Sequence, residues 1–311
     1  MSYTVRIKEE ISSITSGKSE TIAETSAYIR NNGIITDKIT MTTENKLIVD
    51  KVVNTIKDLY HITTKVEVID NVNFSKKDLY QLTIDQKVEE ILKDLGIFND
   101  KNKYNDTVPN YIVGANEEIR GYLRGVFLAV GSISDPKTSR YHMELLVNDA
   151  KEAVFVQKLL NIFDLNAKIL NREKGYMIYI KEAEKISDFL KILGAVKAVL
   201  YFEDVRIYRD QKNKTNRLNN CEQANMDKII QTAEEQLKQI EIIEENDGVT
   251  LLDEKVREAL EYRKKYPEAS LKELAEIISI ETNKPITKSG LNHRLRKIKD
   301  LSERFKKQTS E

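Results

Sequence analysis

Cysteine and histidine are scarce in this chain of 311 residues. It has one cysteine, Cys221, and three histidines, His61, His142 and His293. One cysteine cannot form an intramolecular disulfide, and the thiol and imidazole groups do not have the spacing of a zinc site. We therefore expect no structural metal and no cofactor.

Long apolar runs are also missing. No stretch reaches the roughly 18 uncharged apolar residues that a membrane helix needs, and the N-terminal segment MSYTVRIKEEISSIT has charges every few residues instead of an apolar signal core. The apolar content is 40%, with 4 prolines and 11 glycines, which is typical of a soluble globular protein with two or three domains. We expect a cytoplasmic protein with no membrane partner.

Net charge is absent, because 50 Lys and Arg residues balance 50 Asp and Glu residues. The distribution is nevertheless uneven. Residues 234–258 contain nine acids and three bases, whereas residues 284–307 contain nine bases and two acids. The last part of the chain is therefore a basic patch on a neutral protein.

A sequence unit recurs at an offset of 98 residues over the first two thirds of the chain. Helix-like apolar patterns end at Gly33 and again at Gly131, and later ones end at Gly96 and Gly194. Alternating and amphipathic patterns between these anchors predict the order α-β-β-α-β-β-α in each copy. The expected strands are residues 38–43, 79–85, 141–147 and 175–180, with helices over 46–60 and 151–163.

Two nine-residue segments carry a resemblance to a known motif. TSAYIRNNG (Thr25–Gly33) and LRGVFLAVG (Leu123–Gly131) are each followed by a strand pattern, and both resemble the LAGLIDADG signature of homing endonucleases. The resemblance implies two closely packed helices at the centre of an α/β saddle whose sheets lie on DNA. Small residues in these helices permit such close packing.

These segments lack the carboxylates that the nuclease family uses for metal-dependent cleavage. Divalent metal catalysis needs a carboxylate at the eighth motif position of each helix, but those positions are Asn32 and Val130. Asp37 and Asp135 follow the glycines, and Asp135 precedes Pro136, so we expect both to be turn residues. Cleavage by such displaced acids remains the alternative.

The C-terminal third predicts a helix-turn-helix. A polar segment over 212–225 looks like a domain boundary and is followed by a connecting helix that Gly248 closes, with Ile229, Ile230, Ala233, Leu237, Ile240 and Ile243 on one face. A second helix stops before Pro267. Ser270 and Glu273 then form a capping box at the start of a short amphipathic helix.

The last helix has the residue types that read DNA. Its apolar stripe is Leu291, Leu295, Ile298, Leu301 and Phe305. Arg and Asn can contact guanine and adenine edges, and cations neutralise phosphates. We assign base edges to Ser289, Asn292, His293 and Arg296, and the phosphate backbone to Lys288, Arg294, Lys297 and Lys299. The alternative is an ordinary amphipathic helix with a basic outer face.

The degenerate motif pair is followed by four characteristic segments, NRLNNCEQAN, QIEIIEEN, PEASLKELAE and KSGLNHRLRKIKDL. Together these features resemble the WhiA family of bacterial sporulation and cell-division regulators. The resemblance implies a transcription factor or cell-division protein, linked to chromosome segregation where sporulation is absent, that has lost catalysis. The expected partner is double-stranded DNA at the nucleoid.

The fold class follows as α+β, a two-repeat LAGLIDADG-like saddle with an all-α helix-turn-helix. We expect repeats over 1–100 and 101–211, a linker and connecting helix over 212–248, and the DNA-binding domain over 249–311. Six cations are scattered over the repeats: Lys65, Lys137, Arg140, Lys168, Arg172 and Lys174. Docking of a protein, for example a sigma factor or division component, and weak DNA contact are both open for that domain.

Overall fold

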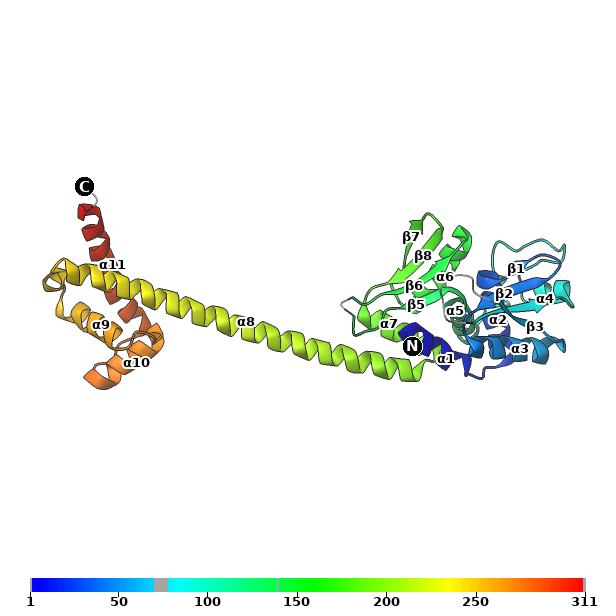
Figure 1. Cartoon of the computed structure of the whole chain (residues 1–311), viewed down its shortest axis with the longest axis horizontal. Coiled ribbons are helices and arrows are strands. Elements are labelled where there is room, and N and C mark those ends of the chain that lie inside the picture. The colour runs from blue at the N-terminus through cyan, green and yellow to red at the C-terminus, as the bar shows by residue number, and fades with distance from the viewer. Residues whose placement is uncertain (1, 70–77, 139, 310–311) are drawn as a thin grey trace. The chain divides into compact units, whose positions relative to one another are not determined.

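The computed structural model describes residues 2–69, 78–138 and 140–309. The chain divides into two compact units, Met1–Arg209 and Asp210–Glu311, which are described separately below. Figure 1 shows the strands gathered in the first unit and helices making up the second.

The first unit is built from two copies of one arrangement. The first copy contains α2 (Lys18–Asn32), β1 (Ile34–Ile35), β2 (Ile39–Thr43), α3 (Lys46–Tyr60), β3 (Lys65–Ile69), β4 (Leu79–Ile84) and α4 (Val88–Asp94). The second contains α5 (Asn116–Val130), β5 (Gly131–Ile133), β6 (Met143–Val147), α6 (Ala150–Ile162), β7 (Lys168–Arg172), β8 (Gly175–Ile180) and α7 (Ala183–Leu193). The predicted element order is confirmed in both copies.

Each copy forms a four-stranded antiparallel sheet. The strand orders are β1-β2-β4-β3 and β5-β6-β8-β7, so the two sheets have the same topology. Alternation along β2 and β6 places Ile39, Met41, Met143 and Leu145 in one continuous core. The period of two residues in the sequence thus decides which sheet face is buried.

Helices α2 and α5 pack against each other with almost no space between their backbones. A side-chain carbon at Gly121 or Gly125 of α5 would overlap the carbonyl oxygens of Glu20 and Glu24 of α2. Ala23 and Ala27 of α2 are fully buried in the same region. The small residues seen in the sequence are therefore needed for this helix crossing.

A charged network lies at this crossing. Arg124 of α5 is 3% exposed and donates from Nε to Glu24 at 2.7 Å, and it also pairs with Glu20. Glu24 accepts a second ion pair from Lys51 of α3 at 2.6 Å. Every charge in the network has an opposite partner, which is the condition for stable burial of ionised groups.

The first helix was not identified from the sequence. Helix α1 (Tyr3–Ser12) begins at Ser2, whose side chain accepts a hydrogen bond from the amide of Val5. Tyr3, Ile7 and Ile11 are its buried residues, and the Tyr3 hydroxyl donates to the carbonyl of Ala198 at 2.8 Å. The cap and the four-residue spacing of these apolar residues are the signals that could have predicted it.

Helix α8 (Val196–Glu245) is one uninterrupted helix that crosses the division between the units. The expected polar linker is therefore wrong in its local structure, because residues 212–225 are helical and exposed. Its predicted apolar face is mostly correct: Ala233, Ile240 and Ile243 are buried. Ile230 is an error, since it is 44% exposed.

The second unit continues with a 3-10 turn η1 (Gly248–Leu251) and three helices, α9 (Glu254–Lys265), α10 (Leu271–Thr282) and α11 (Lys288–Thr309). The predicted capping box is confirmed, with Ser270 accepting from the amide of Glu273 and the Glu273 carboxylate accepting from the amide of Ser270. A separate apolar core joins these helices to the end of α8 through Ile240, Ile243, Leu260, Leu274 and Leu295.

Candidate nucleic-acid interface

Helix α11 is held on the second unit by its apolar stripe. Leu291, Leu295 and Ile298 are buried, and Leu301 and Phe305 pack against the same core. This is the stripe predicted from the sequence. Its burial against α9 and α10 turns the opposite side of α11 outward.

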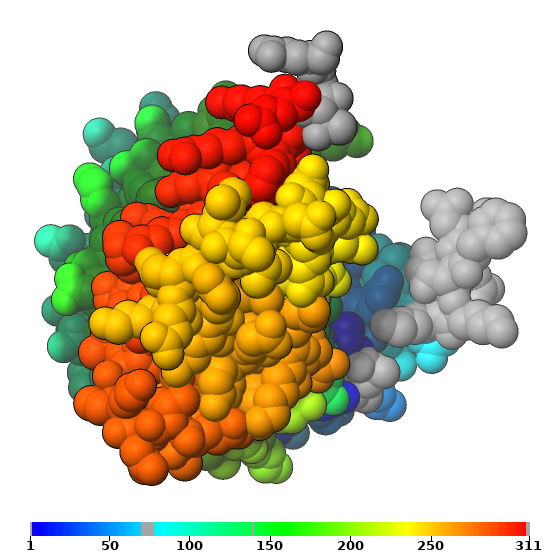
Figure 2. Space-filling view, turned by 90° about the vertical axis from the view of Figure 1, so that its left-hand side faces the viewer, coloured from blue at the N-terminus to red at the C-terminus, as the bar shows by residue number. Residues whose placement is uncertain are grey.

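The side chains assigned to base edges lie on that outward side. Ser289, His293 and Arg296 are exposed, and Asn292 is half-buried. Within the described part of the chain, none of these four side chains has a hydrogen-bond or ion-pair partner. In Figure 2 the surface of the C-terminal helices, coloured yellow to red, faces the viewer. The four side chains on the outward side of α11 are therefore not engaged by any described residue of the protein.

The N-terminal end of α11 is fixed by the turn that precedes it. Residues 283–287 separate α10 from α11, so the turn is longer than three or four residues, as the sequence indicated. The amide of Ile286 donates to Ser279 Oγ at 2.9 Å, and the Thr287 hydroxyl accepts from the amide of Gly290 at 3.1 Å. These bonds determine where the first turn of α11 begins.

Three of the four cations assigned to phosphates are paired with acids of the same unit. Arg294 contacts Glu258 of α9 at 2.7 Å, Lys297 contacts Asp253 at 2.9 Å, and Lys299 lies 3.8 Å from Glu303. A hydrogen bond from Lys297, with a backbone hydrogen bond from Val256, lowers the pKa of Asp253. Lys288 has no such acid partner among the described residues.

The two degenerate motif positions are occupied by an amide side chain and an apolar side chain, and both make internal contacts. The Asn32 amide donates to the Tyr28 hydroxyl at 2.8 Å and to the carbonyl of Thr42 at 2.9 Å, while Val130 is half-buried against the core. In the described ranges, no group of three or more His, Cys, Asp or Glu residues is arranged to hold a metal.

The two displaced acids lie in turns. Asp37 follows β1 and accepts from the Thr36 hydroxyl at 2.9 Å. Asp135 follows β5 and accepts from the amide of Lys137 at 2.9 Å and from the Tyr201 hydroxyl at 3.2 Å. The bonds of Asp37 with Thr36 and of Asp135 with Lys137 are of the kind that turn residues make, whereas the bond with Tyr201 ties Asp135 to α8.

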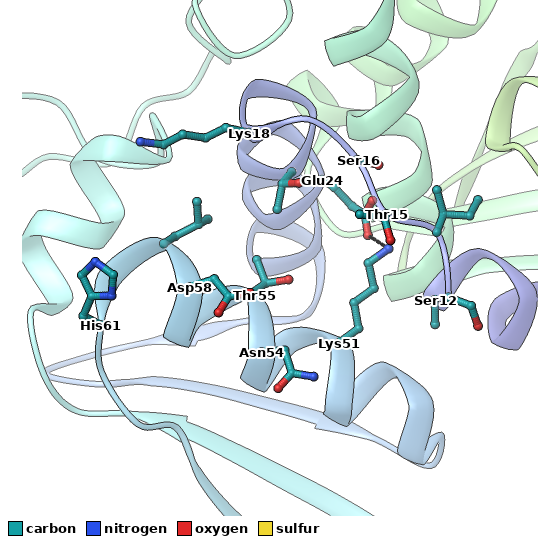
Figure 3. A pocket seen from close by; sticks show the side chains of 14 residues that line it. Ser12, Thr15, Ser16, Lys18, Glu24, Lys51, Asn54, Thr55, Asp58 and His61 are labelled. Carbon is teal, nitrogen blue, oxygen red and sulfur yellow. Dashed lines mark ion pairs between the residues drawn. The ribbon is translucent and has the colours of Figure 1, made fainter.

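A polar pocket of about 620 Å³ lies between the end of α1, α2 and α3. Figure 3 shows Lys51 and Glu24 joined by an ion pair, with His61 and Lys18 farther along the wall. Asp58 is a second acid of the lining, so cations and acids face the same space. The charges of this pocket are balanced from within, and no ligand class is indicated by them.

The six cations of the repeats are spread over different elements. Lys65 is on β3 and pairs with Asp85, whereas Lys168 and Arg172 are at the two ends of β7. The remaining three are in connections: Lys137 and Arg140 lie between β5 and β6, and Lys174 lies between β7 and β8.

A group of cations that the sequence did not reveal lies beside α10. Lys228 of α8, Arg263 of α9, Lys272 of α10 and Lys288 of α11 line one pocket. Each comes from a different helix of the second unit, so no local spacing in the sequence could have predicted their proximity.

No helix within the described ranges combines the length and apolar character required to pass through a lipid bilayer.

Three family models match the chain in succession. A WhiA N-terminal LAGLIDADG-like domain matches residues 18–98, a WhiA LAGLIDADG-like domain matches residues 119–212, and a WhiA C-terminal HTH domain matches residues 215–302. The two copies of the first unit are therefore LAGLIDADG-like, and the second unit is a helix-turn-helix.

Curated relatives match over their full lengths. A probable cell division protein WhiA of Enterococcus faecalis is 40% identical, with 100% of both chains covered. A relative of the same name from Pediococcus pentosaceus is 39% identical over 98% of this chain and 100% of its own. The crystal structure of full-length WhiA from Thermatoga maritima matches with a TM-score of 0.57 at 24% identity, covering 98% and 99% of the two chains.

Proposed function

Because the chain belongs to the WhiA family, we propose that it is a sequence-specific duplex-DNA-binding protein. It acts in transcriptional regulation, in cell division and chromosome segregation, or in both, at the nucleoid and without nuclease activity. The observation that carries this proposal is the outward polar face of α11, which has no partner inside the described protein.

The proposed contacts divide between sequence reading and positioning. Ser289, Asn292, His293 and Arg296 occupy the first turns of α11, the part of a recognition helix that enters the major groove. Lys288, Lys297 and Lys299 flank them and are exposed, so we assign these lysines to phosphates.

Arg294 has a different position from the flanking lysines. Its side chain is 20% exposed and bridges Glu258 to the carbonyl of Lys255. A phosphate contact from Arg294 therefore requires exchange of Glu258 for the phosphate. In the free protein its role is to hold α11 against α9.

The absence of nuclease activity is proposed on chemical grounds. Val130 offers no metal ligand, and Asn32 offers at most one neutral amide oxygen. Asp37 and Asp135 are engaged in turns. A pair of hard oxygen ligands at the centre of the saddle cannot be assembled from these residues.

The repeat unit is proposed to dock a protein such as a sigma factor or a division component. Leu146 of β6 and Leu170 of β7 are 43% and 48% exposed, and both are cross-strand partners of Met177. Cross-strand partners share a sheet face, so this row presents apolar surface, which suits a protein better than phosphates. Weak DNA contact through the scattered cations is the alternative.

Selection of sites from randomised duplexes with the full chain tests the DNA-binding proposal. Arg296→Ala is expected to relax sequence preference, whereas Lys297→Ala should weaken all sequences alike and lower the salt dependence. Arg304→Ala, farther along the same exposed face, is the control and should retain the preference. If Arg296→Ala and Lys297→Ala both leave selected-site binding unchanged, the assignment of α11 is wrong.

Incubation with plasmid DNA and Mg²⁺ or Mn²⁺ tests the absence of cleavage. We expect intact plasmid with the wild-type chain. Cleavage that disappears in Asp37→Asn or Asp135→Asn would contradict the proposal and establish displaced acids as catalytic.

The docking proposal is tested by crosslinking in cells. Leu170→Glu should remove protein crosslinks while the purified variant keeps wild-type DNA affinity. Val154→Glu introduces the same charge at an exposed apolar position of α6 and should change neither. A loss of DNA affinity in Leu170→Glu with retained protein crosslinks would instead favour the weak DNA contact.

A further inference from the structure

The second unit has a pocket of about 330 Å³ whose lining is strongly cationic. Four of its nine lining residues are Lys228, Arg263, Lys272 and Lys288, and none of the nine is acidic. This distribution differs from that of the pocket in the first unit, where acids and bases are mixed. Such a one-signed lining favours a negatively charged ligand.

Arg263 is a buried cation of this pocket without a counter-ion. It is 1% exposed, and one of its guanidinium nitrogens, Nη1, donates to the carbonyl of Ala269 at 2.7 Å and to that of Tyr266 at 3.3 Å. Its Nε has no hydrogen-bond partner, and no acid of the described chain forms an ion pair with it. Burial lowers the pKa of the group. A buried charge satisfied only by neutral carbonyls is costly until an anion approaches.

The N-terminal end of α10 contributes to the lining of the same pocket. Ser270 and Glu273 satisfy each other through the capping box. The next two amides, of Leu271 and Lys272, have no acceptor within the described chain, and both residues line the pocket. Free amides at a helix N-terminus, with the helix dipole behind them, form an anion-binding arrangement.

The lysines at the rim are available for an external anion. Lys228 and Lys288 are exposed and form no ion pair within the described residues. Lys272 lies 3.9 Å from Glu276, and both side chains are exposed, so this pairing is weak. A ligand in the pocket would therefore not need to displace a buried acid.

We propose that this pocket binds a backbone phosphate of duplex DNA, with Lys228 and Lys288 at its rim and the amides of Leu271 and Lys272 facing it. The proposal rests on the proposed function, because Lys288 is the first residue of α11 and immediately precedes Ser289, which is assigned to a base edge. It extends the DNA interface beyond α10 and α11 to α8, through Lys228.

The test compares two lysines of α8 in the full chain. DNA affinity for a duplex selected by the wild type is measured between 50 and 200 mM salt for Lys228→Gln and for Lys238→Gln, an exposed residue of α8 outside the pocket. Loss of one phosphate contact should lower the slope of log affinity against log salt by about 0.9 and the affinity by roughly three- to tenfold. Lys238→Gln should behave as the wild type.

The outcomes separate the pocket from the wider DNA-binding proposal. A lower slope for Lys228→Gln alone supports the phosphate pocket. If both variants have the same salt slope as the wild type while Arg296→Ala still relaxes sequence preference, the pocket assignment is wrong. The proposed function then remains intact. No duplex binding by the wild-type chain overturns both.

An experiment with inorganic phosphate tests whether the anion in the pocket belongs to DNA or to a free phosphate-bearing ligand. Thermal unfolding of the wild type and Lys228→Gln is compared in phosphate and in chloride of equal ionic strength. If phosphate protects only the wild type while the DNA slopes are equal, the pocket binds a free phosphate-bearing ligand and the assignment to DNA is wrong. Protection together with the lower slope supports the assignment.

Discussion

The two units each bury an arginine, and the two arginines have opposite surroundings. Arg124 is 3% exposed and is bound by Glu24 and Glu20, whereas Arg263 is 1% exposed and is bound only by carbonyls. Burial by itself lowers the pKa of both groups. The two glutamates outweigh this effect at Arg124, whose pKa is raised, while nothing opposes it at Arg263, whose pKa is lowered.

A buried arginine side chain therefore has two different roles in the two units. At Arg124 the charge is neutralised inside the unit and joins the two repeats. At Arg263 the positive charge remains uncompensated and faces a pocket with further cations. The first arrangement is complete without a ligand, and the second gains a counter-ion when an anion enters.

The largest effect is expected from Arg124→Met. The substitution removes the buried partner of Glu24 and Glu20 and leaves Glu24 paired with Lys51 alone. Breaking a buried pair in this way costs about 3–5 kcal/mol of unfolding free energy. Urea unfolding, with hydrogen exchange to localise the loss to the first unit, measures it. Arg120→Met on the exposed side of the same helix is the control. Equal losses in both variants would contradict the role of the network.

Gly125→Ala tests the close packing that places Arg124 next to its partners. The added carbon would overlap the carbonyl of Glu24, and overpacking of this kind costs about 1–3 kcal/mol, occasionally more. Gly290→Ala is the matched change in α11, where the nearest atom would lie 3.4 Å away. It should be neutral or stabilising by up to about 1 kcal/mol, because alanine favours helix. Thermal unfolding of both variants measures these two changes in stability.

Arg263→Met should destabilise the free protein less than Arg124→Met does. It removes hydrogen bonds to loop carbonyls, worth about 1–2 kcal/mol in total, but it also removes an uncompensated buried charge. The same urea experiment measures it in chloride buffer. A loss of unfolding free energy as large as that of Arg124→Met would mean that the two buried arginines have the same structural role. This result would contradict the difference between them described above.

The smallest effect is expected at an exposed ionic contact of the second unit. Glu281 accepts hydrogen bonds from Lys265 at 2.8 Å and from Tyr266 at 2.6 Å, and these lower its pKa from 4.5 to about 2. A lowered carboxyl pKa stabilises the fold above the unfolded value and loses that contribution as the pH falls from 4.5 to 2. The Tm difference between the wild type and Glu281→Gln should therefore be slight at pH 7 and narrow toward pH 3. A Tm difference that stays constant from pH 7 to pH 3 would contradict this prediction.

Local patterns in the sequence predicted most of the fold. The 98-residue offset gave the element order of both repeats, because each helix and strand buries one face and so leaves a period in the sequence. The capping box at Ser270 and the stripe from Leu291 to Phe305 likewise identified α10 and α11. These features depend on neighbours within a few residues, which a single sequence contains.

The features that could not be predicted are of two kinds: a solvent-exposed helix and contacts between residues far apart in the chain. Neither leaves a periodic pattern in the local sequence. Residues 212–225 form part of α8 while exposed to solvent, so no apolar period distinguishes this helix from a linker. The ion pairs of Arg294 and Lys297 with α9 and its cap residue Asp253, and the pocket of Lys228 and Arg263, join residues far apart in sequence. Charge counts identified the basic patch but not which of its cations were already paired.

The central helix crossing also makes the two repeats complementary instead of identical. At the 98-residue offset Arg124 corresponds to Ser26, Glu24 to Tyr122, and Gly125 to Ala27. Two first repeats paired with each other would place Glu24 opposite a serine instead of an arginine, and two second repeats would place Arg124 opposite a tyrosine instead of Glu24, with Glu118 at the position of Glu20. Neither pairing would reproduce the ion pair between Arg124 and Glu24, so the two halves of the crossing are not interchangeable.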